Sequence, residues 1–104
     1  MSILVYHNDE FTDLHYNIDR KTDRELARIW SSNQTKLVAR VDTVSLEKAF
    51  VLTNNNFGHP WADNEEVECG TAHAFRSTSA GDFMVYECDL YVVNDFGFRL
   101  VRRD

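Results

Sequence analysis

The alternation of apolar and polar positions is clearest between residues 36 and 43. Apolar side chains recur there at every second position, which is the period of a β-strand with one buried face. One face of the expected strand carries Leu37, Ala39 and Val41, and the other carries Val38, Arg40 and Asp42. The pattern therefore predicts a strand that covers a core with its first face.

A change of period after residue 22 predicts a helix. Thr22 and Glu25 match a capping box, in which the hydroxyl and the carboxylate accept hydrogen bonds from backbone N–H groups that the first helical turn leaves unpaired. Leu26, Ile29 and Trp30 follow at i, i+3 and i+4. The polar run at residues 31–33 then predicts the end of this helix.

A second helix is expected after Ser45, whose hydroxyl can cap it. Apolar and small side chains follow at i, i+3, i+4 and i+7, which is the spacing of one buried helical face. They are Leu46, Ala49, Phe50 and Thr53. The three asparagines at residues 54–56 predict its end.

The remaining strand signals lie at the two ends of the chain. Residues 3–7, 83–87, 90–94 and 98–102 are rich in β-branched and aromatic side chains. The dipeptide Cys88-Asp89 predicts a tight hairpin connection, and Gly97 precedes the last strand. Residues 9–21 have no clear period and fit either a loop or a short strand. We expect one α+β domain over residues 1–104, a small antiparallel sheet with two helices packed on one face.

The charge of the chain bears on its partners. Seventeen acidic and eleven basic residues give −6, which argues against nucleic acid as a direct partner. Arg99, Arg102 and Arg103 form a local basic cluster, for which a solvated tail is the simpler interpretation. The apolar runs are far shorter than the ~18 residues of a membrane span, and the N-terminus does not resemble a signal peptide. These features predict a cytoplasmic protein without membrane contact.

A long segment without a period, residues 57–74, is the candidate binding region. It carries Trp61 and a run of carboxylates, Asp63, Glu65, Glu66 and Glu68. An amphipathic aromatic side chain with a charged border is typical of the centre of a protein interface. The alternative is that Trp61 folds back onto the core.

Other residue groupings give weak signals for chemistry. His59, Cys69, His73 and Cys88 include ligand types, but only one pair has close spacing, whereas structural zinc sites use two close pairs. We interpret both cysteines as reduced, buried thiols. Ser77, Ser79 and His73 are neighbours in sequence only, and neither a nucleophile elbow nor a phosphate loop is present. We expect no enzymatic activity, no metal and no cofactor.

Several short motifs carry a family resemblance when they are taken in order. They are Ser-Leu-Glu-Lys-Ala-Phe at 45–50, Thr-Asn at 53–54, His-Pro-Trp at 59–61, Arg-Ser-Thr-Ser-Ala-Gly-Asp at 76–82, Tyr-Val-Val at 91–93 and Phe-Gly-Phe at 96–98. About the last sixty residues thus resemble the YodL-like small accessory proteins of phages, plasmids and bacterial chromosomes. In that family an Arg-Ser-x-Ser-x-Gly-Asp motif precedes a hairpin that ends in a Gly-Phe pair.

The resemblance implies a mobile-element setting, no established enzymatic activity and, for some members, binding to host proteins. The motif residues also suit turns, since glycine and short polar side chains favour them. These expected structural turn residues are Ser77, Ser79, Gly81, Asp82 and Gly97.

The function expected from these observations is that of an accessory protein that binds a host protein and modulates its activity. Trp61 and the carboxylates of the acidic run are the expected contacts. The first alternative is an acidic mimic of DNA that inhibits a restriction, CRISPR or other nucleic-acid enzyme. The second alternative is a small metal-dependent enzyme. The partner and the oligomeric state are left open.

Overall fold

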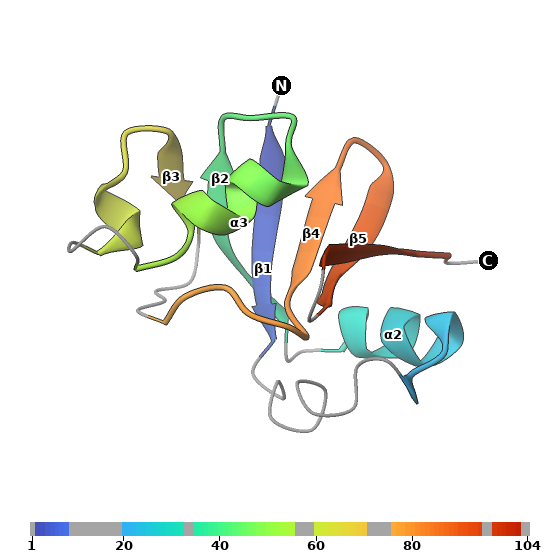
Figure 1. Ribbon diagram of the computed structural model, residues 1–104. Helices are drawn as coiled ribbons and strands as arrows, with labels where there is room; N and C mark the ends of the chain where they lie inside the picture. The colour runs from blue at the N-terminus through green and yellow to red at the C-terminus, as the bar shows by residue number, and fades with distance from the viewer. Residues whose placement is uncertain are drawn as a thin grey trace.

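A six-stranded antiparallel sheet forms the centre of the computed structural model, which describes residues 2–8, 20–32, 35–55, 60–70, 76–94 and 97–102. The strand order is β3-β2-β1-β4-β5-β6 (Figure 1). The strands are β1 (Ile3–Asn8), β2 (Thr35–Val41), β3 (Val67–Cys69), β4 (Phe83–Tyr86), β5 (Asp89–Asn94) and β6 (Gly97–Val101). The predicted α+β class is therefore confirmed. None of the helices in the described segments has the length and apolarity that crossing a membrane requires.

Both predicted helices are present with the caps that the sequence indicates. Helix α2 spans Asp23–Trp30, and Thr22 and Glu25 form the full capping box. Helix α3 spans Leu46–Leu52, and the Ser45 hydroxyl accepts a hydrogen bond from the Lys48 N–H at 3.2 Å. A short 3₁₀ helix, η2, spans Trp61–Asp63.

The two helices cover opposite faces of the sheet, so the expectation that both pack on one face is wrong. Strand β4 shows this, because its successive buried residues point to opposite faces. Phe83 joins the core cluster that contains Leu26 of α2, whereas Met84 joins the cluster that contains Ala49 of α3. In Figure 1, α3 crosses the sheet beside β1 and β2, and α2 lies at the other end of the sheet. Because β4 carries buried apolar side chains on both faces, a helix is needed to cover each face of the sheet.

Strand β2 departs from the simple alternation that predicted it. Ala39 and Val41 are buried as expected, but Val38, which the alternation places on the opposite face, is also buried in the α3 cluster. The β1–β2 register changes between Val5 and Tyr6, which pair with Ala39 and Leu37, so Val38 is an extra residue. Such a bulge shifts the alternation of the strand by one position.

Two connections differ from the sequence expectation. The β4–β5 turn consists of Glu87 and Cys88, because Tyr86 pairs with Asp89, and Glu87 has a φ of 56°. Part of the segment expected to be a long loop forms η2 and β3, and β3 pairs with β2. After β3 the chain passes so close to β2 that a Cβ on Gly70 would lie 2.5 Å from the Leu37 carbonyl oxygen. Only glycine fits this approach.

Candidate functional site

The acidic residues singled out by the sequence are all exposed. Asp63 closes η2, Glu65 and Glu66 lie in the following turn, and Glu68 lies on β3. Arg40 faces Glu68 across the β2–β3 pair. The structure therefore brings most of the predicted charged residues to one end of the sheet.

A groove of about 340 Å³ lies at this end of the sheet. Its lining is Ser2, Arg40, Asp42, Glu65, Glu66, Val67 and Glu68. Four carboxylates and one guanidinium give these residues a formal charge of −3. We call this feature the acidic groove. Its charge favours a basic segment as a ligand.

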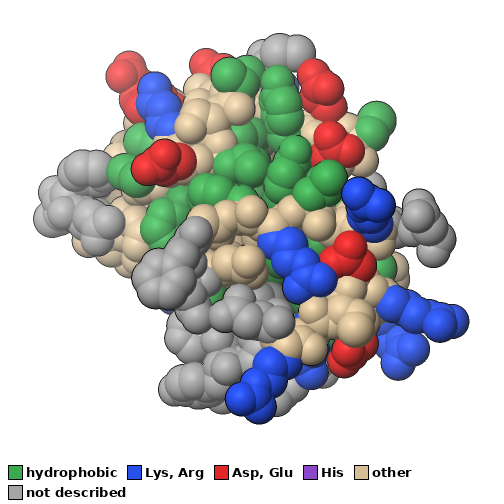
Figure 2. Space-filling model, turned by 45° about the vertical axis from the view of Figure 1, so that its right-hand side comes forward, with side chains coloured by type: hydrophobic (Ala, Val, Ile, Leu, Met, Phe, Trp, Pro, Cys, Tyr) green, Lys and Arg blue, Asp and Glu red, His purple; other side chains and the backbone are tan. Residues whose placement is uncertain are grey.

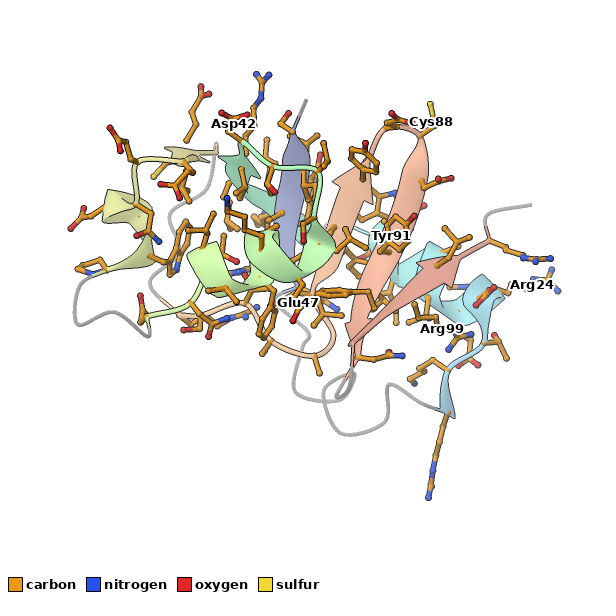
Figure 3. All side chains as sticks on the ribbon, turned by 45° about the horizontal axis from the view of Figure 1, so that its top comes forward. Arg24, Asp42, Glu47, Cys88, Tyr91 and Arg99 are labelled. Atoms are coloured by element: carbon orange, nitrogen blue, oxygen red, sulfur yellow. The ribbon has the colours of Figure 1, made fainter. Side chains whose placement is uncertain are left out.

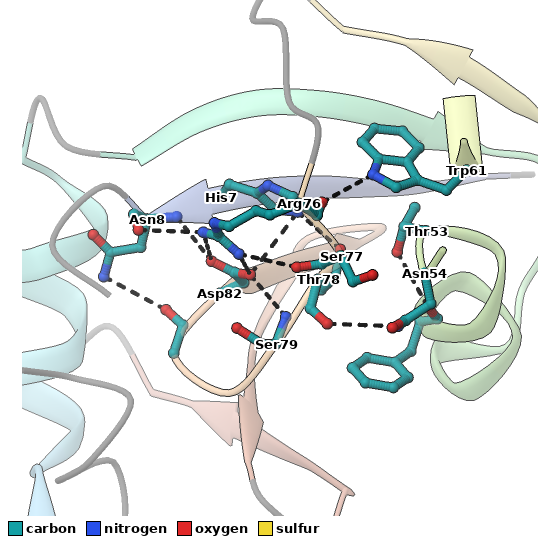
Figure 4. Close-up of polar contacts among 12 residues, drawn as sticks. His7, Asn8, Thr53, Asn54, Trp61, Arg76, Ser77, Thr78, Ser79 and Asp82 are labelled. Atoms are coloured by element: carbon teal, nitrogen blue, oxygen red, sulfur yellow. Dashed lines mark hydrogen bonds and ion pairs between the residues drawn. The ribbon is translucent and has the colours of Figure 1, made fainter. Parts of the chain in front are cut away.

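Trp61 is not part of this exposed surface. Its side chain is 2% exposed and belongs to the α3 core cluster. The indole Nε1–H donates a hydrogen bond to the Arg76 carbonyl oxygen at 2.9 Å (Figure 4). The Trp61 backbone N–H donates to Asn55 Oδ1 at 2.9 Å. The ring therefore follows the alternative interpretation, in which it folds back onto the core. Sequence spacing does not reveal this, because the hydrogen-bond acceptor lies fifteen residues away.

The Arg-Ser-Thr-Ser-Ala-Gly-Asp motif forms a buried polar network around Asp82 (Figure 4). The Arg76 guanidinium donates to both carboxylate oxygens of Asp82, at 2.6 and 2.7 Å. The backbone N–H groups of Asn8 and Ser79 donate to the same carboxylate, each at 2.9 Å. Each Asp82 oxygen thus accepts two hydrogen bonds, which compensates the burial of its charge.

Of the other predicted turn residues, Ser77, Ser79 and Gly81 belong to or flank this network, whereas Gly97 begins β6. The Ser77 hydroxyl accepts a hydrogen bond from the Asn55 N–H at 2.9 Å, so it ties the motif to the end of α3. Gly81 has a φ of 98° and Gly97 a φ of 126°, in the region that favours glycine. The motif therefore joins β1, the end of α3 and β4.

His7, Thr78 and Asp82 lie together in the same network, as a catalytic triad would require. His7 Nε2 is hydrogen-bonded to Thr78 Oγ1 at 2.9 Å and lies 3.9 Å from Asp82 Oδ2. One ring nitrogen thus faces both partners, whereas in a triad the carboxylate holds the other nitrogen. All three residues are at most 3% exposed. The arrangement holds β1 against the segment that precedes β4. A substrate cannot reach the Thr78 hydroxyl in this conformation, because Thr78 is buried.

The four residues weighed as metal ligands, His59, Cys69, His73 and Cys88, do not form a metal site within the described segments. His59 and His73 lie outside those segments. Cys69 on β3 and Cys88 in the β4–β5 turn are both exposed, so the expectation that they are buried is wrong. No group of three or more His, Cys, Asp or Glu side chains in the described segments could hold a metal ion.

A surface that the sequence reasoning missed lies beside α3, over the β4–β6 end of the sheet. Partly exposed apolar side chains gather there on the α3 face: Phe50, Tyr86, Tyr91, Phe98 and Leu100. Figure 2 shows hydrophobic side chains joined into a band on one face of the molecule, with acidic side chains at its borders. We call these five residues the apolar face. The signal in the sequence was that β5 and β6 carry apolar residues at both odd and even positions.

A third group of residues carries the basic charge. Helix α2 lies against β6, and the Arg99 guanidinium donates a hydrogen bond to the Lys21 carbonyl oxygen at 2.8 Å and binds the Asp23 carboxylate. The backbone N–H of Arg102 and the Arg99 guanidinium hold the pKa of Asp23 below its usual value. Hydrogen bonds from the Thr22 N–H and hydroxyl likewise lower the pKa of Glu25.

Comparison with known proteins adds no assignment, since no protein-family model, curated protein or solved structure matches this chain.

Proposed function

We propose that this protein acts by binding another protein and carries out no chemical step of its own. The apolar face is the observation that supports this proposal. Leu100 is 46% exposed on the edge strand β6, and it lies directly opposite Tyr91 on β5. Apolar side chains grouped on the surface of a small domain are typical of protein interfaces.

The composition of the apolar face suits an interface. Tyr and Phe bury a large area at a small cost in side-chain entropy, and such residues dominate binding hot spots. The Phe98 ring packs edge-on against Phe50 of α3, with a centroid distance of 6.3 Å. This contact holds the edge of the face in a fixed shape before a partner binds, which lowers the entropic cost of binding.

Charges beside the apolar face and in the acidic groove bear on the chemistry of the partner. Asp89 is exposed on the same face as Tyr91, two positions away on β5. Figure 3 shows Glu47 of α3 and Tyr91 in one region of the molecule. We propose that the partner offers an apolar anchor flanked by basic residues, with a further basic stretch for the acidic groove. Trp61 contributes to the fold as a member of the α3 core cluster and makes no contact with the partner.

The biological setting we propose is that of a phage or plasmid accessory protein that modulates a host protein. The resemblance of the motifs between residues 45 and 98 supports this setting. A binding protein of this kind changes the activity of its target by occupying a surface of the target, and this requires no catalytic residues of its own.

Photo-crosslinking tests the proposal with no assumption about the identity of the partner. The photoreactive residue p-benzoylphenylalanine replaces Tyr91 in one variant and Leu100 in another, and the cells that carry the gene are irradiated. Val44 is the matched control position, because it is 57% exposed and lies in neither core cluster. We expect a discrete covalent adduct with one host protein from positions 91 and 100 and none from position 44.

Two results would overturn the proposal. The first is the absence of any adduct from both positions in variants whose circular dichroism matches the unmodified protein. The second is an adduct from Val44 of equal yield, since that would reflect accessibility alone. An adduct of twice the mass of the chain would show that the protein bound at this face is a second copy of the chain and not a host protein.

A further inference from the structure

The packing of α2 against β6 gathers arginine side chains from two distant parts of the sequence. Arg20, Arg24 and Arg28 lie in or just before α2, and Arg102 directly follows β6. All four side chains are exposed. The Arg102 N–H donates a hydrogen bond to Asp23 Oδ2 at 3.3 Å, which brings the two segments together. We call these four residues the arginine surface.

The local charge is opposite to that of the whole chain. Six basic residues (20, 21, 24, 28, 99 and 102) and two acidic residues (23 and 25) lie in these segments, so the formal charge there is +4. Because the chain carries −6, the other residues carry −10. Among the described residues, the end of the molecule formed by α2 and the end of β6 is therefore basic. In Figure 3, Arg24 and Arg99 lie on the same side of the molecule.

The two carboxylates in these segments are engaged by other partners. Asp23 binds Arg99 and accepts a hydrogen bond from the Arg102 N–H. Glu25 completes the capping box with Thr22 and lies 4.0 Å from the Lys21 ammonium group. No side chain of the arginine surface forms an ion pair with another residue of the described segments. Within the described segments, no carboxylate neutralises these four charges.

Arg24 is placed where it lowers the stability of α2, whereas Arg28 in the last turn complements the helix dipole. Arg24 and Arg28 are four residues apart on one face of α2, where like charges repel each other. Arg24 also lies in the first turn, where the helix dipole disfavours a cation. A bound polyanion would offset both the repulsion between Arg24 and Arg28 and the unfavourable interaction of Arg24 with the helix dipole.

We propose that the arginine surface binds the phosphate backbone of a nucleic acid. Arginine forms paired hydrogen bonds with phosphate through its planar fork, and all four exposed cations here are arginines. An acidic protein is the less favoured ligand, because a protein interface needs an apolar centre. The apolar side chains of this region face the core: Leu26 and Val101 are buried, and Ala27, Ile29 and Trp30 are partly buried against the same cluster.

This site goes beyond the proposed protein binding and lies on the opposite face of the sheet from the apolar face. The acidic groove is formed by residues of β2, the turn before β3 and β3, at the other end of the strand order. It would repel phosphate. The charge distribution thus selects one orientation, in which α2 and the end of β6 face the nucleic acid and the apolar face stays accessible to a protein.

The test uses the purified chain and fluorescein-labelled DNA and RNA oligonucleotides, single-stranded and duplex, in fluorescence anisotropy titrations. Contacts with up to four phosphates predict that affinity falls roughly 100-fold between about 50 and about 200 mM salt. The double variant Arg24→Glu, Arg28→Glu should lose at least ~10-fold in affinity at low salt. The control Lys36→Glu, Lys48→Glu changes the net charge equally at exposed positions outside the surface and should lose much less.

Circular dichroism of both double variants shows whether α2 remains folded. If the helix is lost in Arg24→Glu, Arg28→Glu, the single variant Arg102→Glu takes its place, because Arg102 lies outside every helix and strand. The proposal is overturned if the wild-type chain does not bind any of the oligonucleotides at low salt. Equal losses in the arginine and lysine variants would also overturn it, as would equally tight binding of polyglutamate. Crosslinking from Leu100 is independent of all these results.

Discussion

Arg76 and Asp82 form a two-pronged ion pair, with Nη1–Oδ2 at 2.6 Å and Nη2–Oδ1 at 2.7 Å. The Asp82 side chain is fully buried, while the Arg76 side chain is 32% exposed. The same guanidinium donates to the carbonyl oxygens of Ser77 and Asn8, at 3.1 and 3.4 Å. This pair therefore connects β1, the segment before β4 and the turn that enters β4.

The first prediction follows from that pair. Arg76→Ala leaves the Asp82 carboxylate buried without its counter-charge, so we expect the free energy of unfolding to fall by about 3–5 kcal/mol. Asp82→Ala should lower the free energy of unfolding by a similar amount. The double variant should lose less than the sum of the two single losses, because the two residues act as one unit. Urea denaturation measures all three. Arg40→Ala, at an exposed position, is the control and should change stability by no more than about 0.5 kcal/mol.

The second prediction concerns Trp61. Because the ring is buried and its N–H is hydrogen-bonded to the Arg76 carbonyl, Trp61→Ala should destabilise the fold by about 3–5 kcal/mol. Trp61→Phe retains most of the packing but leaves that carbonyl without its donor, and should cost about 1–3 kcal/mol. Thermal unfolding by circular dichroism checks both. Full stability of Trp61→Ala would mean that the ring is not in the core.

The capping box gives the third prediction. The Thr22 hydroxyl accepts a hydrogen bond from the Glu25 N–H at 3.1 Å. Thr22→Ala removes this acceptor and should lower stability by about 0.5–2 kcal/mol, whereas Thr22→Ser keeps the hydroxyl and should change it little. Chemical denaturation of the two variants measures the difference between their free energies of unfolding. Equal stability of the two variants would contradict a role for the cap.

Stability should also depend on pH in the acid range. Backbone and side-chain hydrogen bonds lower the pKa values of Asp23 and Glu25 in the folded state. Their contribution is therefore present above the unfolded-state pKa values, near pH 4, and is lost as pH falls through the lower folded-state values. The double variant Asp23→Asn, Glu25→Gln should unfold with a weaker pH dependence below about pH 4. Melting temperatures across this range, for both proteins, measure the difference.

The acidic groove gives the fifth prediction, which rests on the proposed binding function. Replacing Glu65, Glu66 and Glu68 by lysine reverses the charge of the groove and should weaken binding to the crosslinked partner by at least ~10-fold at low salt. The effect should shrink as ionic strength rises, because exposed charges are screened. The matched control replaces them by glutamine, which removes charge without reversing it and should weaken binding less. Salt-independent affinity of the wild type would exclude an electrostatic contribution.

Local signals in the sequence predicted local structure well. The capping box before α2 and the capping hydroxyl of Ser45 were sufficient because a cap and the turn it closes lie within four residues. Five of the six strands were found for the same reason, since each shows its own apolar pattern, whereas β3 lies in the segment expected to be a loop. The turn between β4 and β5 was misplaced by one residue, because the register that fixes it is set by Tyr86 and Asp89 on two different strands.

The candidate sites depended on contacts that no local pattern contains. Trp61 was assigned to a surface because its neighbours in sequence are acidic, but its indole N–H donates to the backbone of Arg76. The apolar face was missed because Tyr91 and Leu100 become neighbours only when β5 and β6 pair. The arginine surface likewise forms only when α2 packs against β6.

The sequence by itself determined α2 and α3 and where they begin, the strands other than β3, and the concentration of polar side chains in the Arg-Ser-Thr-Ser-Ala-Gly-Asp motif. Only the tertiary structure decided that each helix covers a different face of the sheet, that Asp82 lies buried beneath Arg76, and that an acidic chain has a basic end. The physical reason is the range of the interactions. Caps and periodicity act within a turn or a strand, whereas burial and charge clustering are properties of segments that only folding brings together.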